Sequence, residues 1–217
     1  MQQGSRGRGR FITLEGPDGA GKSSQADRLV DALRVEGHAV CQVREPGGTH
    51  LGEGIRDLLM AAQRHHPRSD ALLFNAARAA LIDEVIRPAL DRGELVICDR
   101  YADSTLAYQG YGSGLDLEEL RGLNRWATGG LVPDLTILFD VPVAEGLARR
   151  AGGPRRGRTR FEDPTYHDAA FHQRVRDGYR ALAAAEPGRW RTLDASRSPE
   201  AVAGELSALV REWLVGP

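Results

Sequence analysis

The sequence predicts an α/β protein with a five-stranded parallel sheet and helices on both of its faces. Short, largely apolar runs alternate along the chain with longer segments in which apolar residues recur at helical spacing. Strands that are apolar at nearly every position are typical of parallel sheets that are covered on both faces. Right-handed crossovers between such strands place the intervening helices on the two faces.

Five segments have the composition of strands. In chain order they are residues 11–14, 39–43, 95–98, 135–139 and 190–193. The first, third and fourth are continuous runs of apolar and β-branched side chains, which favour a pleated surface that is buried on both sides. The second and fifth are short runs that stand between helical segments and complete the alternation.

Seven segments have helical periodicity. They are residues 23–35, 51–63, 70–90, 117–127, 143–150, 168–185 and 199–214. In the first, Ala26, Leu29, Val30 and Leu33 follow the spacing of one helix face. The segment 70–90 is long and rich in alanine, the best helix former. Between the helices, residues 151–160 are rich in Gly, Pro and Arg and contain no acidic residue, which is typical of a mobile surface loop.

Composition limits the classes of function. The chain has 217 residues, 41% of them hydrophobic and 27% charged, as expected of a globular domain. The net charge of −1 argues against a general nucleic-acid or membrane-surface binder, so we expect neither partner. No apolar run reaches the roughly 18 residues that cross a bilayer. Cys41 and Cys98 lie in apolar strand-like runs, which favours buried reduced thiols and a cytoplasmic protein.

Residues 1–10 differ in character from the rest of the chain. They contain Gly, Ser, Gln and Arg but no apolar core of a secretory signal. We therefore expect residues 1–10 to form a disordered tail and residues 11–217 to form a single domain.

The chain contains only one lysine, Lys22, among its 29 basic Lys and Arg residues. Most of the arginines are explained by genome composition, but a lysine supplies a compact charge that arginine does not. Lys22 stands in the run Gly16-Pro17-Asp18-Gly19-Ala20-Gly21-Lys22-Ser23, which matches the phosphate-loop pattern between an expected strand and an expected helix. The position of the lysine therefore indicates a nucleotide-phosphate site.

The phosphate loop predicts specific roles for its residues. Its glycines let backbone N–H groups approach phosphate oxygens, and the following helix adds the partial positive charge of its N-terminus. Lys22 is expected on the β- and γ-phosphates and the Ser23 hydroxyl on Mg²⁺. We expect the phosphates of ATP to contact Gly16, Asp18, Gly19, Ala20, Gly21, Lys22, Ser23 and Ser24.

Asp99 follows the third apolar strand directly. A carboxylate at the carboxyl end of a strand beside a phosphate loop can hold Mg²⁺ directly or through water. An aspartate at this position also often caps the next helix. With the phosphate loop present, we predict that Ser23 and Asp99 hold the Mg²⁺ that accompanies ATP.

Further stretches indicate the acceptor. Arg44-Glu45-Pro46-Gly47-Gly48-Thr49 follows the second strand, and Phe74-Asn75-Ala76-Ala77-Arg78 lies in the long helix. Asp99-Arg100-Tyr101 leads into Ser104-Thr105-Leu106-Ala107-Tyr108-Gln109-Gly110. Together with the phosphate loop, these stretches resemble the thymidylate kinases, which phosphorylate dTMP to dTDP. The resemblance covers the chain from Phe11 onward and implies a P-loop nucleoside monophosphate kinase fold with a lid.

The resemblance implies an acceptor site for dTMP. Phe74 matches the ring that stacks on thymine and Arg78 the group that reaches its O4 atom; without the resemblance, a core aromatic and a solvated arginine would be expected. Arg56 and Arg100 match the arginines of the phosphate, and Tyr108 matches the tyrosine that crowds the ribose 2′ position. The full expected set is Asp18, Glu45, Arg56, Phe74, Arg78, Arg100, Ser104, Thr105, Tyr108 and Gln109.

In this set, Ser104, Thr105 and Gln109 match positions that bond the base edge. Asp18 matches an acidic loop residue near the acceptor sugar and the metal. Glu45 matches a pocket position that contacts the nucleotide or organises the turn at Pro46.

An arginine-rich lid is expected at about residues 150–163. Its arginines are Arg149, Arg150, Arg155, Arg156, Arg158 and Arg160. A solvated basic loop would have the same composition, but an arginine that closes over ATP stabilises the charge of the transferring phosphoryl group. Because Gly19 leaves the phosphate loop without an arginine, the chain resembles the bacterial type with the catalytic arginine in the lid. Arg160 is the expected residue, with Arg156 as the alternative, and Arg149 is expected to stack on adenine.

The predicted catalytic residues are thus Lys22, Arg100 and Arg160. The resemblance also implies a homodimer. One alternative function is a kinase for another deoxynucleotide, such as dUMP, or for a deoxynucleoside, whose hydroxyl would need a base such as Glu45. The other is a nucleotide-dependent switch without transfer chemistry, which would have no need for Phe74, Arg78 and Gln109 in one crevice.

Overall fold

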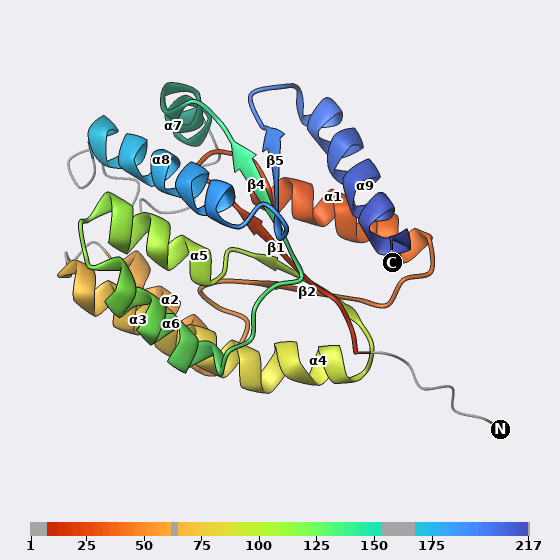
Figure 1. The fold of residues 1–217 in the computed structure, drawn as a ribbon, viewed down its shortest axis with the longest axis horizontal. Coiled ribbons are helices and arrows are strands. Elements are labelled where there is room, and N and C mark those ends of the chain that lie inside the picture. Colours follow the sequence, from red (N-terminus) through yellow and green to blue (C-terminus); the bar gives the residue numbers. More distant parts are fainter. Residues whose placement is uncertain (1–7, 62–64, 153–167, 217) are drawn as a thin grey trace.

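The computed structural model describes residues 8–61, 65–152 and 168–216 and contains one five-stranded parallel sheet (Figure 1). The strand order is β2-β3-β1-β4-β5. The strands are β1 (Phe11–Glu15), β2 (Val40–Arg44), β3 (Leu95–Asp99), β4 (Leu135–Asp140) and β5 (Trp190–Asp194). All four pairings are parallel. The predicted fold class and its five strands are therefore confirmed.

Helices connect the strands, and one more helix follows the last strand. They are α1 (Lys22–Val35), α2 (His50–Met60), α3 (Pro67–Leu81), α4 (Arg87–Asp91), α5 (Ala102–Thr105), α6 (Leu117–Thr128), α7 (Val143–Gly152), α8 (Ala169–Ala185) and α9 (Pro199–Val215). Two π-helical segments, η1 (Ile82–Ile86) and η2 (Leu106–Gly112), continue α3 and α5. Each of the seven expected helices has a counterpart, and side-chain caps such as Asp168 on the Phe171 N–H group begin several of them.

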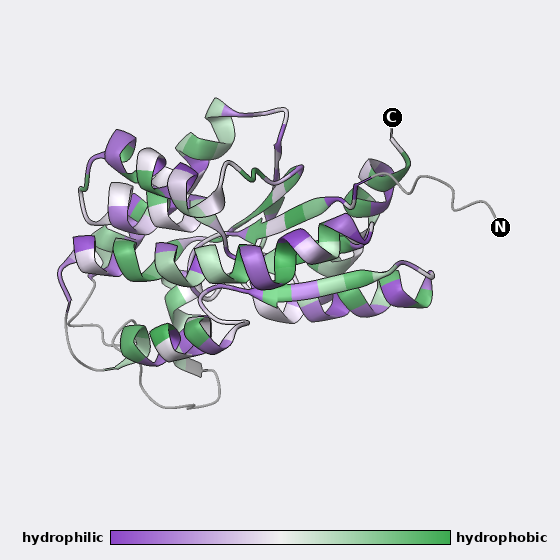
Figure 2. Ribbon diagram, turned by 90° about the horizontal axis from the view of Figure 1, so that it is seen from below, coloured by the Kyte–Doolittle hydropathy of each residue, from purple (hydrophilic) through white to green (hydrophobic). Residues whose placement is uncertain are grey.

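The side chains of β1 alternate between two layers. Ile12 and Leu14 pack with α1 and α9 in one apolar core, whereas Phe11 packs in another core with η1, α4 and Tyr101. Thr13 and Glu15 alternate with Ile12 and Leu14 and therefore point to the second layer. The strands have long hydrophobic stretches, whereas hydrophilic and hydrophobic residues alternate along the helices (Figure 2). Polar groups of β1 in the second layer thus lie inside the protein.

Two expectations for the middle of the chain need correction. The segment 70–90 is not one α-helix, because the π-helical turn η1 separates α3 from α4. This turn ends two residues before Pro88, whose missing N–H group interrupts the α-helical ladder. The segment from Ala102 to Gly112, for which no helix was predicted, forms α5 and η2. Its Ser, Tyr and Gly residues give no clear apolar period.

The folded domain includes residues before Phe11. The Gly9 N–H group bonds to the Leu90 carbonyl, and Arg10 donates to the Trp213 and Leu214 carbonyls on α9. Gly9 and Arg10, which were expected in the tail, therefore belong to the folded unit, and residues 1–7 lie outside the described residues. Within the described ranges, no helix has the length and apolar character that crossing a membrane requires.

Candidate active site

The phosphate loop joins β1 to α1 with three glycines at positive φ. Gly16, Gly19 and Gly21 have φ values of 144°, 77° and 85°. A Cβ atom on Gly16 would lie 2.5 Å from the Phe139 carbonyl oxygen, and one on Gly19 would lie 1.9 Å from the Gly146 carbonyl oxygen. Both the backbone angle and the space therefore require glycine at these two positions. The loop wraps tightly and ends on the N-terminus of α1, which favours anions.

Lys22 begins α1, one residue earlier than predicted, and folds back over the loop. Its Nζ atom donates to the carbonyl oxygens of Gly16 and Pro17, at 2.9 Å each. Burial, together with the nearby charge of Arg100, lowers the pKa of Lys22 to about 8. A phosphate at the loop would give this buried ammonium an anionic oxygen in place of its two carbonyl acceptors.

Asp99 and Ser23 meet beside the loop, as the sequence predicted. The Ser23 hydroxyl donates to Asp99 Oδ2 at 2.5 Å, while Asp99 Oδ1 is buried and has no hydrogen-bond partner among the described residues. A hydroxyl and a carboxylate with a spare oxygen fit Mg²⁺, which is commonly held by one or two protein ligands, substrate phosphates and water. The described residues contain no cluster of three His, Cys, Asp or Glu side chains able to hold a metal. These two residues thus fit a metal that shares its coordination with a nucleotide.

Two adjacent cavities open at the carboxyl ends of the strands. The smaller, of about 260 Å³, is lined by the phosphate loop, Ser24 and Asp99. The larger, of about 390 Å³, extends toward α2, α3 and η2. Both are lined by Asp18, Gly19, Ser23 and Arg100. Two ligands in these cavities would therefore meet at this shared wall.

Arg100 is the central cation of the shared wall. Its backbone has a φ of 72°, which is uncommon for a residue with a side chain, and its N–H group donates to the Leu14 carbonyl. The guanidinium donates to Asp18 Oδ1 at 2.6 Å and to the Tyr108 hydroxyl at 3.2 Å. Burial opposes its charge, but the neighbouring Tyr108, Tyr179 and Asp18 raise the pKa of Arg100, so it stays charged.

Arg150 is a site residue that sequence reasoning did not single out from the lid arginines. It lies on α7, lines the larger cavity and donates to Asp18 Oδ2 at 2.9 Å. Burial would raise the pKa of Asp18, but Arg100 and Arg150 outweigh it and hold that pKa well below its usual value. One carboxylate thus holds two arginines between the cavities.

Arg78 lines the larger cavity but is almost entirely enclosed, with 1% of its surface exposed. Its five N–H groups point at acceptors on Glu45, Asn75, Tyr101, Thr105 and Asn124. The ordinary expectation of a solvated arginine is therefore wrong. A contact with thymine O4 stays a prediction, and it would have to share an N–H group that Asn75 or Thr105 accepts in this structure.

Glu45 is buried and forms a two-point ion pair with Arg78, with Glu45 Oε2 at 2.7 Å from NH2 and 2.9 Å from Nε. It also precedes the cis peptide bond to Pro46. Arg56 donates to the Pro46 carbonyl at 3.0 Å and lines the same cavity. Glu45 and Pro46 thus hold Arg78 and Arg56, respectively, at one wall of the cavity.

The base-edge candidates differ in how far they are already bonded. The Thr105 hydroxyl accepts from Arg78, and the Ser104 hydroxyl donates to Glu15 Oε2 at 2.6 Å. Gln109 is buried and lines the cavity, and its amide makes no side-chain hydrogen bond to a described residue. Phe74 lines the cavity from α3 and packs near Ile55, Leu59 and Ala77. Of the three polar groups, Gln109 is therefore the one open to a new partner.

The lid lies largely outside the described residues. Arg156 and Arg160, the two candidates for the catalytic arginine, fall in the segment 153–167, so their positions stay predictions. Arg149 is described and donates to the carbonyl oxygens of Ala195 and Ser196, after β5. Its predicted stacking on adenine also stays a prediction.

Comparison with known proteins gives one consistent family. The family model described as thymidylate kinase matches residues 14–206. The chain belongs to the thymidylate kinase family. It is 54% identical over 202 residues to the thymidylate kinase of Thermomicrobium roseum, covering 93% of this chain and 94% of the relative. It is 52% identical over 206 residues to that of Deinococcus radiodurans, covering 94% and 97%.

A solved structure agrees with this family. The crystal structure of thymidylate kinase from Ehrlichia chaffeensis matches with a TM-score of 0.75 and 34% identity, covering 94% of this chain and 99% of that one. The chain is thus a nucleoside monophosphate kinase with the family's fold, and dTMP phosphorylation is its activity. The expectations for family, fold and activity are confirmed and favoured over a switch or a nucleoside kinase.

Proposed function

We propose that the chain transfers the γ-phosphoryl group of Mg·ATP to dTMP across the wall that joins its two cavities. The observation that carries this proposal is the shared lining of Asp18, Gly19, Ser23 and Arg100. The smaller cavity has the loop and helix N-terminus that suit the phosphates of ATP. The larger has the volume and polar groups that suit a nucleoside monophosphate.

On the donor side, Lys22 leaves its carbonyl partners on Gly16 and Pro17 for the β- and γ-phosphate oxygens. Ser23 and Asp99 would hold Mg²⁺, which supplies charge neutralisation at the phosphates when it is bound. In the lid, Arg160 or Arg156 covers the γ-phosphate, and Arg149 lies beside the adenine.

On the acceptor side, Arg100 and Arg56 bind the phosphate of dTMP, and Asp18 keeps Arg100 in place. Phe74 stacks on thymine, while Gln109, Arg78 and Thr105 contact its polar edge. Tyr108 stands beside the sugar; its hydroxyl accepts from Arg100, so it also marks the boundary between sugar and phosphate.

No general base is needed in this reaction. The attacking atom is an oxygen of the acceptor phosphate, which carries about −1.5 to −2 charges near neutral pH. The obstacle is instead repulsion between two anions, and positioned cations reduce it. This agrees with the positions of Arg100, Arg150 and Lys22 around Asp18 at the shared wall.

The assay that tests this proposal supplies Mg·ATP with dTMP, dUMP, dCMP, dGMP or thymidine and measures ADP formation. We expect the largest kcat/KM with dTMP. A larger value with another monophosphate would overturn the acceptor assignment, and a larger value with thymidine would indicate hydroxyl chemistry that uses a base. Nucleotide hydrolysis that is unaffected by every acceptor would support the switch.

The proposal extends to assembly and location. The chain from Gly9 onward forms one domain with a lid at about 150–163, since Gly9 and Arg10 bond to α4 and α9. A homodimer is supported by α2 and α3, whose Leu51, Leu58 and Leu72 are all more than half exposed, since stable homodimers bury apolar faces. A cytoplasmic location is supported by Cys41 and Cys98, which are both free thiols.

A further inference from the structure

Glu15 is a buried carboxyl group to which the reaction above gives no role. It is the last residue of β1, is 0% exposed and lines neither cavity. The Tyr101 N–H group donates to its Oε1 atom at 2.8 Å. Its Oε2 atom accepts from the hydroxyls of Ser104, at 2.6 Å, and Tyr179, at 3.0 Å. Burying a carboxyl group is costly, so three dedicated donors indicate a specific role.

The same two hydroxyls also face Arg100. The NH1 group of Arg100 lies 3.3 Å from Ser104 Oγ and 3.3 Å from Tyr179 Oη. A hydroxyl has one hydrogen, so it can accept from Arg100 only while that hydrogen points elsewhere. Tyr179 donates to Glu15 directly or through Ser104, 2.8 Å away. In both arrangements the hydrogens run toward Glu15, and the lone pairs remain for Arg100.

The main chain of Arg100 is fixed as well. Its N–H group is bonded to the Leu14 carbonyl, and its own carbonyl accepts from the Cys98 thiol. The positive φ of Arg100 directs its side chain back over Gly16, whose carbonyl is a further acceptor at 3.3 Å. The remaining freedom of the guanidinium is therefore set by its acceptors: Asp18 and Tyr108 on one nitrogen, and the hydroxyls above Glu15 on the other.

We propose that Glu15 and Tyr179 are positioning residues that hold the guanidinium of Arg100 at the acceptor phosphate. An ionised carboxylate is an acceptor only, so it orients the hydroxyls of Tyr179 and Ser104 with their lone pairs toward Arg100. This rests on the proposed role of Arg100 in binding the dTMP phosphate. It assigns Ser104 to Arg100 first and to the base edge second.

The replacement Glu15→Gln tests the orientation with almost no change of shape. The amide oxygen must remain opposite the Tyr101 N–H group, so the NH₂ group faces the two hydroxyls. They must then accept from it and turn their hydrogens toward Arg100. At pH 8, we expect KM for dTMP to rise by at least about tenfold, the size of a lost hydrogen bond to a charged group, while KM for ATP changes less than about twofold.

Tyr179→Phe is the second variant, and it carries the test alone if Glu15→Gln does not fold. It removes one hydroxyl and keeps the ring, which packs edge-to-face on Tyr108. We expect a several-fold rise of KM for dTMP with an unchanged KM for ATP. A rise in both constants, or in neither, would overturn the assignment.

Thr13→Val is the matched control. Thr13 lies on the same face of β1, and its hydroxyl shares a buried hydrogen bond of 2.9 Å with Thr136. Its loss costs a buried polar contact but leaves Arg100 untouched. We expect a lower thermal midpoint and unchanged KM values. If Thr13→Val raised KM for dTMP as much as Glu15→Gln, loosening of the fold would explain both and the proposal would be wrong.

A double-mutant cycle separates a positioning role from an independent one. In an Arg100→Ala background, we expect Glu15→Gln to cause no further loss of kcat/KM for dTMP. Multiplying losses would show that Glu15 acts without Arg100. Failure of the proposed function is distinguishable, because the wild-type protein would then prefer another acceptor, and the cycle would be repeated with that acceptor.

Discussion

The position of the Arg78 side chain depends on partners from distant parts of the sequence. From the local sequence, Arg78 is a helix residue one turn after Phe74. In the structure, its guanidinium is enclosed by partners as far apart in the sequence as Glu45 and Asn124. A buried arginine with all donors used is rigid, and rigidity is what a specificity contact needs. Local spacing could predict that Arg78 lies near Phe74, but not that it is already saturated.

Arg150 and Arg149 are neighbours with different expected effects. Arg150 bonds to Asp18, whereas Arg149 bonds to Ala195, Ser196 and Glu145. We expect Arg150→Ala to lower kcat/KM for dTMP by at least about tenfold, because it removes a charge-assisted bond at the shared wall. Arg149→Ala, the matched control, should act on KM for ATP instead. Steady-state kinetics with each substrate varied in turn would measure both, and equal effects on dTMP would contradict the assignment.

The lid arginines are distinguished by a similar comparison. We expect Arg160→Ala to lower kcat by at least about a hundredfold with little change in dTMP affinity, because the lost interaction forms with the transferring phosphoryl group. Arg156→Ala should have a smaller effect. If the larger loss occurs in Arg156→Ala, the catalytic arginine is the other residue.

Glu15 also predicts a pH dependence of stability. Burial and then Asp103 raise the pKa of Glu15 to about 7, against the bonds from Ser104 and Tyr101 and the charge of Arg100. The charged and titratable groups around it are Arg100, Asp103, Tyr179, Lys22, Arg78 and Cys98. Between about pH 4.5 and 7 the folded protein keeps a proton that the unfolded chain loses, so stability falls as pH rises.

The measurement is the free energy of unfolding in urea from pH 4.5 to 8. We expect Glu15 to contribute a decrease of about 1 kcal/mol for each pH unit between 4.5 and 7, and the decrease should level off above 7. Glu15→Gln should lack this part of the slope. Parallel curves for the two proteins would contradict the raised pKa.

At the scale of elements, the phosphate loop and α7 are packed through two glycines. A Cβ atom on Gly19 would lie 1.9 Å from the Gly146 carbonyl oxygen, and one on Gly146 would lie 2.6 Å from the Asp18 carbonyl oxygen. This contact brings Arg150 to Asp18. It also means that an arginine could not replace Gly19 unless α7 moved, so this chain has no room for a catalytic arginine in the loop.

Two helical glycines should therefore respond in opposite directions to alanine. Gly146→Ala should push α7 from the loop, lowering kcat/KM by at least about tenfold and stability by about 1–3 kcal/mol. Gly204→Ala, on α9 with nothing within 4 Å of the added atom, should raise stability by up to about 1 kcal/mol and leave kinetics unchanged. Urea denaturation and ADP release measure both. Unchanged kinetics in Gly146→Ala would exclude this coupling.

The elements themselves were predictable where a single local rule decides. Continuous apolar runs identified β1, β3 and β4, and the loop motif fixed the start of α1 to within one residue. The Ala102–Gly112 segment was missed because its turns are stabilised by distant contacts, including Phe171 and Val175 of α8 beside Gly112. Tertiary packing, not local preference, makes this segment helical.

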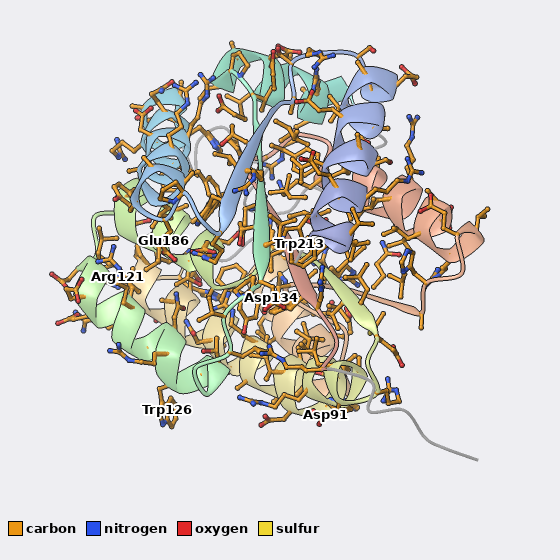
Figure 3. All side chains as sticks on the ribbon, turned by 45° about the vertical axis from the view of Figure 1, so that its right-hand side comes forward. Asp91, Arg121, Trp126, Asp134, Glu186 and Trp213 are labelled. Atoms are coloured by element: carbon orange, nitrogen blue, oxygen red, sulfur yellow. The ribbon has the colours of Figure 1, made fainter. Side chains whose placement is uncertain are left out.

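At the scale of the molecule, the exposed apolar side chains of α2 and α3 predict a dimer. Light scattering should give twice the 23.6 kDa chain mass at micromolar concentration. We expect Leu58→Asp to shift the mass toward the monomer, because it places a charge in an apolar interface. Val35→Asp, at an 88% exposed position on α1, is the control and should remain dimeric. A monomeric wild-type protein would refute the dimer. Trp126, which points outward from α6 (Figure 3), is a further exposed apolar residue whose replacement could be tested by the same mass measurement.

Only some of the site residues could be predicted from the sequence. The loop, Asp99 and the residues around Arg100 stand in short motifs, and the structure brings them to one crevice. Glu15 had a weak signal, a charged residue that ends an apolar strand. Tyr179 had none, because it meets Glu15 across 164 positions of sequence. Positions on one motif are predictable, but partners that join separate elements depend on the packed fold.

Arg10 and Trp213 tie the start of β1 to α9 by a hydrogen bond to the Trp213 carbonyl and by stacking of the guanidinium on the indole ring, 4.9 Å from its centre. This contact lies at the amino ends of the strands, and the crevice lies at their carboxyl ends. If the enzyme were attached to a surface through this corner of the molecule, where Arg10 meets Trp213, its crevice would therefore face the solution. The same corner suits a fused reporter, which would not obstruct substrate entry.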